Sequence, residues 1–193
     1  MKSLSLAVSI AVLVASAAVA GPVSYIVNLS GPNESPSNGS PGTGFATVIL
    51  DTSAHTLFVQ ISFQDLIGTT TASHIHCCTA VPDAGTAGVA TITPTFTGFP
   101  LGVTSGTYTH TYDTSAAVGT WNPAFITANG GTALSAEADF AAGLAAGESY
   151  LNIHTSFAPG GEIRGFLEPV PEPATFVMAG AALLGLVLRR RLR

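Results

Sequence analysis

Between His55 and Phe63 the sequence alternates, with apolar side chains at every second position. Leu57, Val59 and Ile61 take these positions, and polar residues stand between most of them. Successive side chains of a β-strand point to opposite faces, so this pattern predicts a strand with one buried and one solvated face. Such a strand needs a sheet whose apolar face packs against a second layer.

Short segments of similar character recur along most of the chain. Further strands are expected near residues 25–29, 45–51, 71–77, 88–93, 106–112, 149–155 and 162–167. The turn formers at 51–54 predict a hairpin into the alternating strand. Residues 30–44 are dense in Gly, Pro, Ser and Asn, without periodicity, and predict a loop.

Two segments favour helix instead. Residues 122–127 predict one or two turns, and residues 135–146 predict a longer helix with Ser135 as its N-cap and Gly147 as its stop. Many short strands with few helices predict a mainly β fold. We expect a single antiparallel β-sandwich or barrel-like domain over residues 21–168, with one or two short helices.

The N-terminus has the pattern of an export signal. A lone Lys2 precedes a run of apolar and small residues, and Ala18-Val19-Ala20 gives the small-x-small cleavage pattern. Residues 1–20 are therefore predicted to be a secretory signal peptide that a signal peptidase removes after Ala20.

The C-terminus has the pattern of a membrane anchor. Residues 174–188 are uncharged, and a cluster of arginines follows at once. At about 1.5 Å per residue, this stretch forms a transmembrane helix of roughly 22 Å, short of a ~30 Å hydrocarbon core. Basic flanks stay on the cytoplasmic side, so both ends place the body of the chain outside the inner membrane.

Charge is distributed unevenly between the ends and the body. Arg164 is the only lysine or arginine between residues 21 and 168, and ten acidic residues lie in the same range. A nucleic-acid partner requires a basic footprint, so this composition excludes nucleic-acid binding by the body. It favours cationic partners or metal ions.

Three histidines are expected to meet on one face of the sheet. His74 and His76 share a strand face by their i, i+2 spacing, and His154 lies opposite the core-facing pattern of a later strand. If the two strands are neighbours, three imidazoles converge, which suits Zn²⁺ or Cu²⁺. The alternative is a structural polar layer without metal.

Cys77 and Cys78 are the only cysteines, and they are adjacent. Cysteines in an oxidising compartment usually form disulfides, but neighbours do so only through a strained eight-membered ring. The sequence therefore leaves three interpretations open: a vicinal disulfide, two thiols, or additional metal ligands beside the histidines.

Arg164 is expected to hold a fixed partner. A hairpin over residues 156–160 would set Asn152 opposite Arg164, with Glu162 on the same face. The planar guanidinium binds carboxylates in a bidentate manner, so we expect a structural ion pair of Arg164 with Glu162 and Glu34.

The last 24 residues resemble a known sorting signal. Val170-Pro171-Glu172-Pro173, an apolar helix and an arginine cluster follow one another in the order of the PEP-CTERM signal. The resemblance implies a transient membrane anchor, cut near Pro171–Pro173 by an exosortase-type protease. It also implies a Gram-negative bacterium that makes extracellular polysaccharide, and a final location at the cell surface or outside the cell.

The body is similar to the CHRD domain, first named from chordin. The resemblance rests on Leu29-Ser-Gly-x-x-Glu34, Gly44-Phe-Ala-Thr-Val, His74-Ile-His76, Tyr150-x-Asn-Ile-His-Thr155 and Gly-Gly-Glu-Ile-Arg-Gly165. It implies an extracellular β-sandwich-like domain and supplies no catalytic residues. Cys77-Cys78 departs from the Gly-Pro-like residues that follow the histidines in many members. The His-x-His strand is also similar to the copper-ligating strand of Cu/Zn superoxide dismutases.

No nucleophile elbow or His-Glu-x-x-His motif occurs in the sequence. The first hypothesis is therefore a non-enzymatic surface or extracellular-matrix domain, with polysaccharide or surface proteins as partners. The second is a copper- or zinc-binding protein outside the cytoplasm that uses the three histidines. A redox enzyme of the dismutase type is a variant of the second.

Overall fold

The structure is a computed structural model that describes residues 21–171. These residues form an antiparallel sheet of eight strands with two helices and one 3-10 turn. The strands are β1 (Val23–Ser30), β2 (Thr43–Asp51), β3 (Thr56–Gln64), β4 (Thr70–His76), β5 (Gly106–Asp113), β6 (Tyr150–Thr155), β7 (Ile163–Phe166) and β8 (Glu168–Pro169). The helical elements are η1 (Gly31–Asn33), α1 (Pro123–Ala128) and α2 (Ala133–Ala145).

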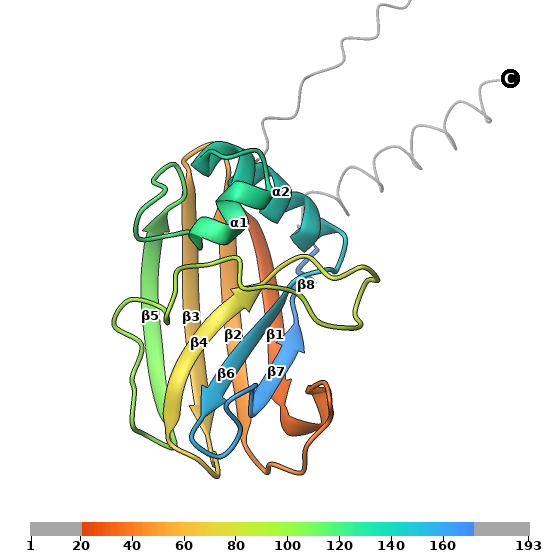
Figure 1. Cartoon of the computed structure of the whole chain (residues 1–193), viewed down its shortest axis with the longest axis vertical. Coiled ribbons are helices and arrows are strands. Elements are labelled where there is room, and N and C mark those ends of the chain that lie inside the picture. Colours follow the sequence, from red (N-terminus) through yellow and green to blue (C-terminus); the bar gives the residue numbers. More distant parts are fainter. Residues whose placement is uncertain (1–20, 172–193) are drawn as a thin grey trace, which may run out of the picture.

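The sheet curls so that its two halves face each other. The strand order is β4-β6-β7-β1-β2-β3-β5, and β8 pairs with β1 beside β7. The halves are joined by a single register pair between β1 and β7, Ser30 with Arg164. Figure 1 shows β4, β6 and β7 in front of the layer formed by β1, β2 and β3, with β5 at the left-hand edge. The expected mainly β, antiparallel fold is confirmed, in the form of a half-barrel.

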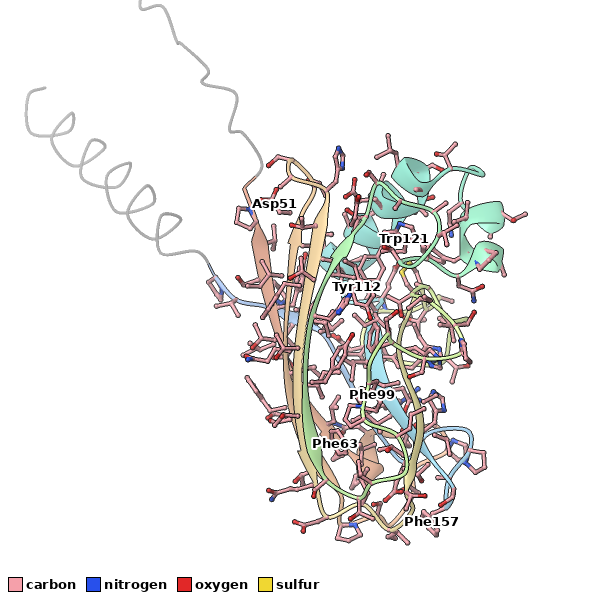
Figure 2. The ribbon with its side chains drawn as sticks, turned by 90° about the vertical axis from the view of Figure 1, so that its left-hand side faces the viewer. Asp51, Phe63, Phe99, Tyr112, Trp121 and Phe157 are labelled. Atoms are coloured by element: carbon pink, nitrogen blue, oxygen red, sulfur yellow. A yellow bond between two sulfur atoms is a disulfide. The ribbon has the colours of Figure 1, made fainter. Side chains whose placement is uncertain are left out.

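The core lies between the two halves and follows from the alternation in the sequence. Leu57, Val59 and Ile61 of β3 are at most 1% exposed, as the period-2 pattern predicts. Ile75 of β4 and Ile153 of β6 close the core from the other half, and both are fully buried. Figure 2 shows the two layers with the side chains between them, Trp121 near the helices and Phe157 at the opposite end.

Both predicted helices are present and cover one end of the sheet (Figure 1). Helix α2 begins earlier than expected, because Thr132 rather than Ser135 is its N-cap. The Thr132 hydroxyl accepts from the Ser135 backbone N–H, and the Ser135 hydroxyl accepts from the Thr132 N–H, a reciprocal capping box. Phe140 of α2 packs edge-on against Trp121, which anchors the helix to the core.

One predicted strand is absent from the described part of the chain. Residues 88–93 make only isolated bridges, Val89 to His76 and Thr91 to Trp121. Thr91 instead uses its hydroxyl to accept from the Ile75 backbone N–H. The segment therefore runs along β4 as an irregular loop, and the residues on either side of it, Ala87 and Pro94, offer their carbonyl oxygens to His76 and His74 of that strand.

Among residues 21–171, no helix has the length and apolar character needed to cross a membrane. The predicted signal peptide (1–20) and the predicted transmembrane helix (174–188) lie outside the described residues, as do Glu172 and Pro173. Pro171 is described and exposed.

Candidate metal centre

His74, His76 and His154 come together on the outer face of the β4–β6 pair. These strands are neighbours, with Ala72 opposite His154 and His74 opposite Asn152. The i, i+2 spacing places His74 and His76 on the same face, and the register brings His154 beside them. Sequence reasoning predicted this convergence on the condition that the strands pair, and the structure meets that condition.

The three imidazoles are close enough to share one ion. Each offers one ligand nitrogen, and the three ligand nitrogens lie within 4.8 Å of one another. The ring centroids are 5.2 Å apart for His74 and His154, and 5.9 Å for each of the other two pairs. Zinc–nitrogen bonds of about 2.0–2.1 Å place tetrahedral ligand atoms about 3.4 Å apart, so the rings need only a small inward movement.

Each imidazole is oriented by a backbone carbonyl. The His74 Nε2 lies 2.6 Å from the Pro94 oxygen. His76 Nδ1 lies 2.9 Å from the Ala87 oxygen, and His154 Nδ1 lies 3.0 Å from the Pro159 oxygen. A carbonyl only accepts, so each of these nitrogens carries the proton. The lone pairs are then on His74 Nδ1, His76 Nε2 and His154 Nε2.

These three lone-pair nitrogens have no hydrogen-bond partner among residues 21–171, although all three are buried. A purely structural polar layer would normally satisfy such atoms, because a buried acceptor without a donor costs free energy. A backbone carbonyl commonly accepts from the outer N–H of a histidine that ligates zinc, and it fixes the orientation of the ring. The donor set therefore fits Zn²⁺ or Cu²⁺.

Burial keeps the histidines neutral, as metal ligation requires. It lowers the pKa of His74 to about 4, against the hydrogen bond to Pro94, which raises it. Burial also lowers the pKa of His76 to about 4, with His154, His74 and Arg164 adding to the effect. The pKa of His154 is lowered by burial as well. Near neutral pH the three lone pairs are therefore free of protons.

Beyond the histidines, Tyr150 and Arg164 support the site. The Tyr150 ring stacks on His76 with centroids 4.7 Å apart and planes 7° apart. The Arg164 guanidinium lies 4.7 Å from the centre of the Tyr150 ring. Arg164 Nε donates to the Asn33 carbonyl at 2.6 Å, and its Nη1 donates to the Gly85 carbonyl. The stack fixes the orientation of His76.

The structure pairs Arg164 with only one of its two expected carboxylates. Glu34 Oε2 lies 3.8 Å from Arg164 Nε, and both side chains are buried. Burial raises the pKa of Glu34 to about 7, although Arg164 and the Ser35 backbone N–H lower it. The expected register of Asn152 opposite Arg164 is present.

Glu162 lies in a separate network, away from Arg164. Its carboxylate accepts from the hydroxyls of Ser40 and Thr155 and from the backbone N–H groups of Ile67 and Gly68. Burial alone would raise the pKa of Glu162, but these hydrogen bonds outweigh it and lower the pKa. Glu162 ties the β6–β7 hairpin to two loops rather than to the guanidinium.

Cys77 and Cys78 form a disulfide, one of the three interpretations that the sequence left open. Cys77 is 5% exposed, and Cys78 is exposed at the surface. The converging ligand atoms belong to the three histidines, without the two sulfurs.

The metal-free chain is expected to lose stability as the pH falls from about 6.5 to 4. The unfolded chain binds protons at His74 and His76 over this range, whereas the folded chain does not until about pH 4. Glu34 makes the folded state more stable as the pH falls, because its raised pKa lets the folded chain bind a proton at a higher pH than the unfolded chain does. Two histidines outweigh one carboxyl, so the net loss is on the order of 3 kcal/mol.

Urea unfolding at pH 7 and pH 4.5, in the presence of a chelator, measures this loss. Glu34→Gln removes the opposing contribution and is expected to steepen it. Equal stability of the variant at both pH values would contradict the assignment of neutral histidines.

Fold and site together define a class: a small antiparallel β domain that presents a three-histidine cluster on one outer sheet face. The CHRD domain matches residues 25–167, and the chain belongs to the CHRD family. The PEP-CTERM protein-sorting motif matches residues 169–191. The resemblances to the CHRD domain and to the PEP-CTERM signal are thus confirmed. No curated protein and no solved structure gave a match.

The sorting motif implies export and envelope-associated sorting in a Gram-negative bacterium, with processing by exosortase-type machinery. The CHRD match adds no catalytic residue to this picture.

Proposed function

We propose that this chain is an exported surface protein whose CHRD domain binds one zinc or copper ion through His74, His76 and His154. The observation that carries the proposal is the set of three buried, unprotonated imidazole nitrogens that face one another without a hydrogen-bond partner. The sorting motif supports a working location at the cell surface or in the extracellular matrix.

Groups of the protein itself would orient the three histidines before an ion binds. The Pro94, Ala87 and Pro159 carbonyls hold the rings in the ligating tautomer. Their orientation is fixed before an ion binds, which lowers the entropic cost of binding. A three-histidine ion would retain an open coordination position, the arrangement that allows Lewis-acid or redox chemistry.

Metal content of the purified chain tests the proposal. The full chain is exported in a Gram-negative host, extracted in mild detergent without a histidine tag, and analysed by mass spectrometry. We expect about one equivalent of zinc or copper per chain. His74→Ala and His154→Ala are each expected to lose it, because two imidazoles bind far more weakly than three.

His110→Ala is the matched control. His110 is a half-buried histidine of β5 that lies outside the cluster, so its variant should keep the ion. Circular dichroism checks that each variant remains folded. A wild-type chain that takes up no stoichiometric metal after loading, or His variants that keep it, would overturn the proposal. Superoxide turnover by the copper-loaded chain then separates a redox enzyme from a binding protein.

A further inference from the structure

We propose that the Cys77–Cys78 disulfide is a thiol-exchange site that sets the affinity of the metal centre. In the oxidised state the disulfide holds His76 in its ligating position, and reduction by a dithiol protein of the cell envelope weakens metal binding. The inference rests on the proposed function of the three histidines, and it concerns the regulation of that same site.

The disulfide begins at the residue after a ligand and shares its supporting loop. His76 ends β4 and forms a bridge to Val89. Its Nδ1 is held by the Ala87 carbonyl, and the Cys77 backbone N–H donates to the Gly88 carbonyl at 3.1 Å. A displacement of Cys77 therefore reaches His76 by two routes, through the covalent chain and through the loop that orients its ring.

The backbone of α2 packs directly onto the two sulfurs. A Cβ placed on Gly143 would lie 2.3 Å from the Cys78 Sγ and 2.4 Å from the Cys77 Sγ, closer than side-chain carbons approach other atoms. Glycine inside a helix costs about 1 kcal/mol relative to alanine. The contact with the disulfide gives a physical reason for glycine at this position of α2.

Two thiols need more room at this contact than a disulfide. Bonded sulfurs are about 2.05 Å apart, whereas atoms without a bond settle at about 3.5–4.0 Å. Because α2 leaves no space at Gly143, reduction forces the Cys77–Cys78 segment or the helix to move. A metal centre tolerates displacements of only about 0.5 Å in its ligands, so movement beside His76 lowers the affinity.

Exposure decides which sulfur a partner attacks. Cys78 is exposed and Cys77 is almost fully buried. The partner's thiolate attacks the Cys78 Sγ, the S–S bond breaks, and Cys77 leaves as a thiolate that takes a proton. The partner's second thiol then attacks the mixed disulfide and releases Cys78, which takes the second proton. The partner ends as a disulfide, and the chain holds two thiols.

The zinc dissociation constant of the full chain, measured by competition with a chromophoric chelator, tests the inference. Zinc is the probe because, unlike copper, it does not oxidise thiols. One sample is oxidised, and the other is reduced on an immobilised dithiol and desalted without oxygen. We expect reduction of the folded chain to give two thiols per molecule. The reduced sample should bind zinc at least about tenfold more weakly than the oxidised sample, and reoxidation should restore the affinity.

Two variants distinguish a steric effect of the disulfide on zinc affinity from zinc binding by the thiolates that reduction creates. The double variant Cys77→Ser/Cys78→Ser has no sulfur to bind zinc, and it should match the weak affinity of the reduced sample. Gly143→Ala places a methyl group where the sulfurs lie, and it should weaken zinc binding by the oxidised chain. Gly39→Ala is its control, because a Cβ there meets no atom within 4 Å.

The outcomes distinguish the two proposals. Zinc affinity that is equal in the oxidised, reduced and double-serine samples, or tighter after reduction, would overturn the switch and leave the metal centre standing. Thiols that appear only after unfolding would overturn the exchange site as well. An oxidised chain that binds no zinc would overturn the metal centre itself.

Discussion

Glu162→Ala is expected to lower the free energy of unfolding by about 3–5 kcal/mol, because it breaks a buried hydrogen-bond network around a carboxylate. The side chain is fully buried and accepts four hydrogen bonds from protein groups. Its removal leaves the Gly68 N–H buried without an acceptor and takes the acceptor from the Ile67 N–H, and a buried N–H costs free energy when unpaired.

Urea unfolding at pH 7 measures the effect of Glu162→Ala, and Glu168→Gln is its control. Glu168 is exposed, so its change should stay within about 0.5 kcal/mol. The stabilisation by Glu162 belongs to the ionised carboxylate, whose folded pKa is lowered from 4.5. The difference between wild type and variant should therefore persist above pH 4.5 and shrink as the pH falls below it. A variant as stable as wild type would refute the role of this network.

Gly165→Ala is expected to destabilise the fold by about 3 kcal/mol, because it adds an atom where the backbone of β7 lies against the backbone of β1. A Cβ on Gly165 of β7 would lie 2.3 Å from the Asn28 carbonyl oxygen and 2.6 Å from a methyl group of Val27. The closer of these atoms belongs to the backbone of β1, which cannot rotate away. Overpacking of this kind commonly costs about 1–3 kcal/mol, and a backbone clash lies at the upper end.

The position of Gly165 makes this clash consequential. It lies next to Arg164, whose pairing with Ser30 joins the two halves of the sheet. Gly160→Ala is the matched control, because that glycine lies in open space and has no positive φ. Thermal unfolding of both variants should show a lower midpoint for Gly165→Ala alone. Equal midpoints would mean that β7 and β1 can separate without loss of stability.

The fold was largely predictable because the strands are short and regular. Alternation in β3 identified its buried face, and the spacing of His74 and His76 placed both on one side. Residues 88–93 were the exception. Their apolar and β-branched character is typical of a strand. However, part of their hydrogen bonding to β4 goes through the Thr91 side chain, which competes with the regular backbone hydrogen bonds of a sheet.

The groups that complete the site could not be found from the sequence. The Ala87, Pro94 and Pro159 oxygens orient the histidines, but every residue carries a carbonyl, so no residue type marks this role. The separation of Glu162 from Arg164 could not be predicted from the sequence for a similar reason. The i, i+2 spacing gives a shared face, but it does not reveal that Ser40 and Thr155 capture the carboxylate.

The chain enters and leaves the domain side by side, which determines how a load on its tail is carried. Pro169 of β8 pairs with Tyr25 near the start of β1, and the Val170 N–H donates to the Ser24 carbonyl. A pull on the residues after Pro171 would peel these few hydrogen bonds one at a time, from the end of the short strand. A load on the tail therefore reaches the pairing of β7 with β6, which begins at Phe166 and Tyr150, only after β8 has separated from β1.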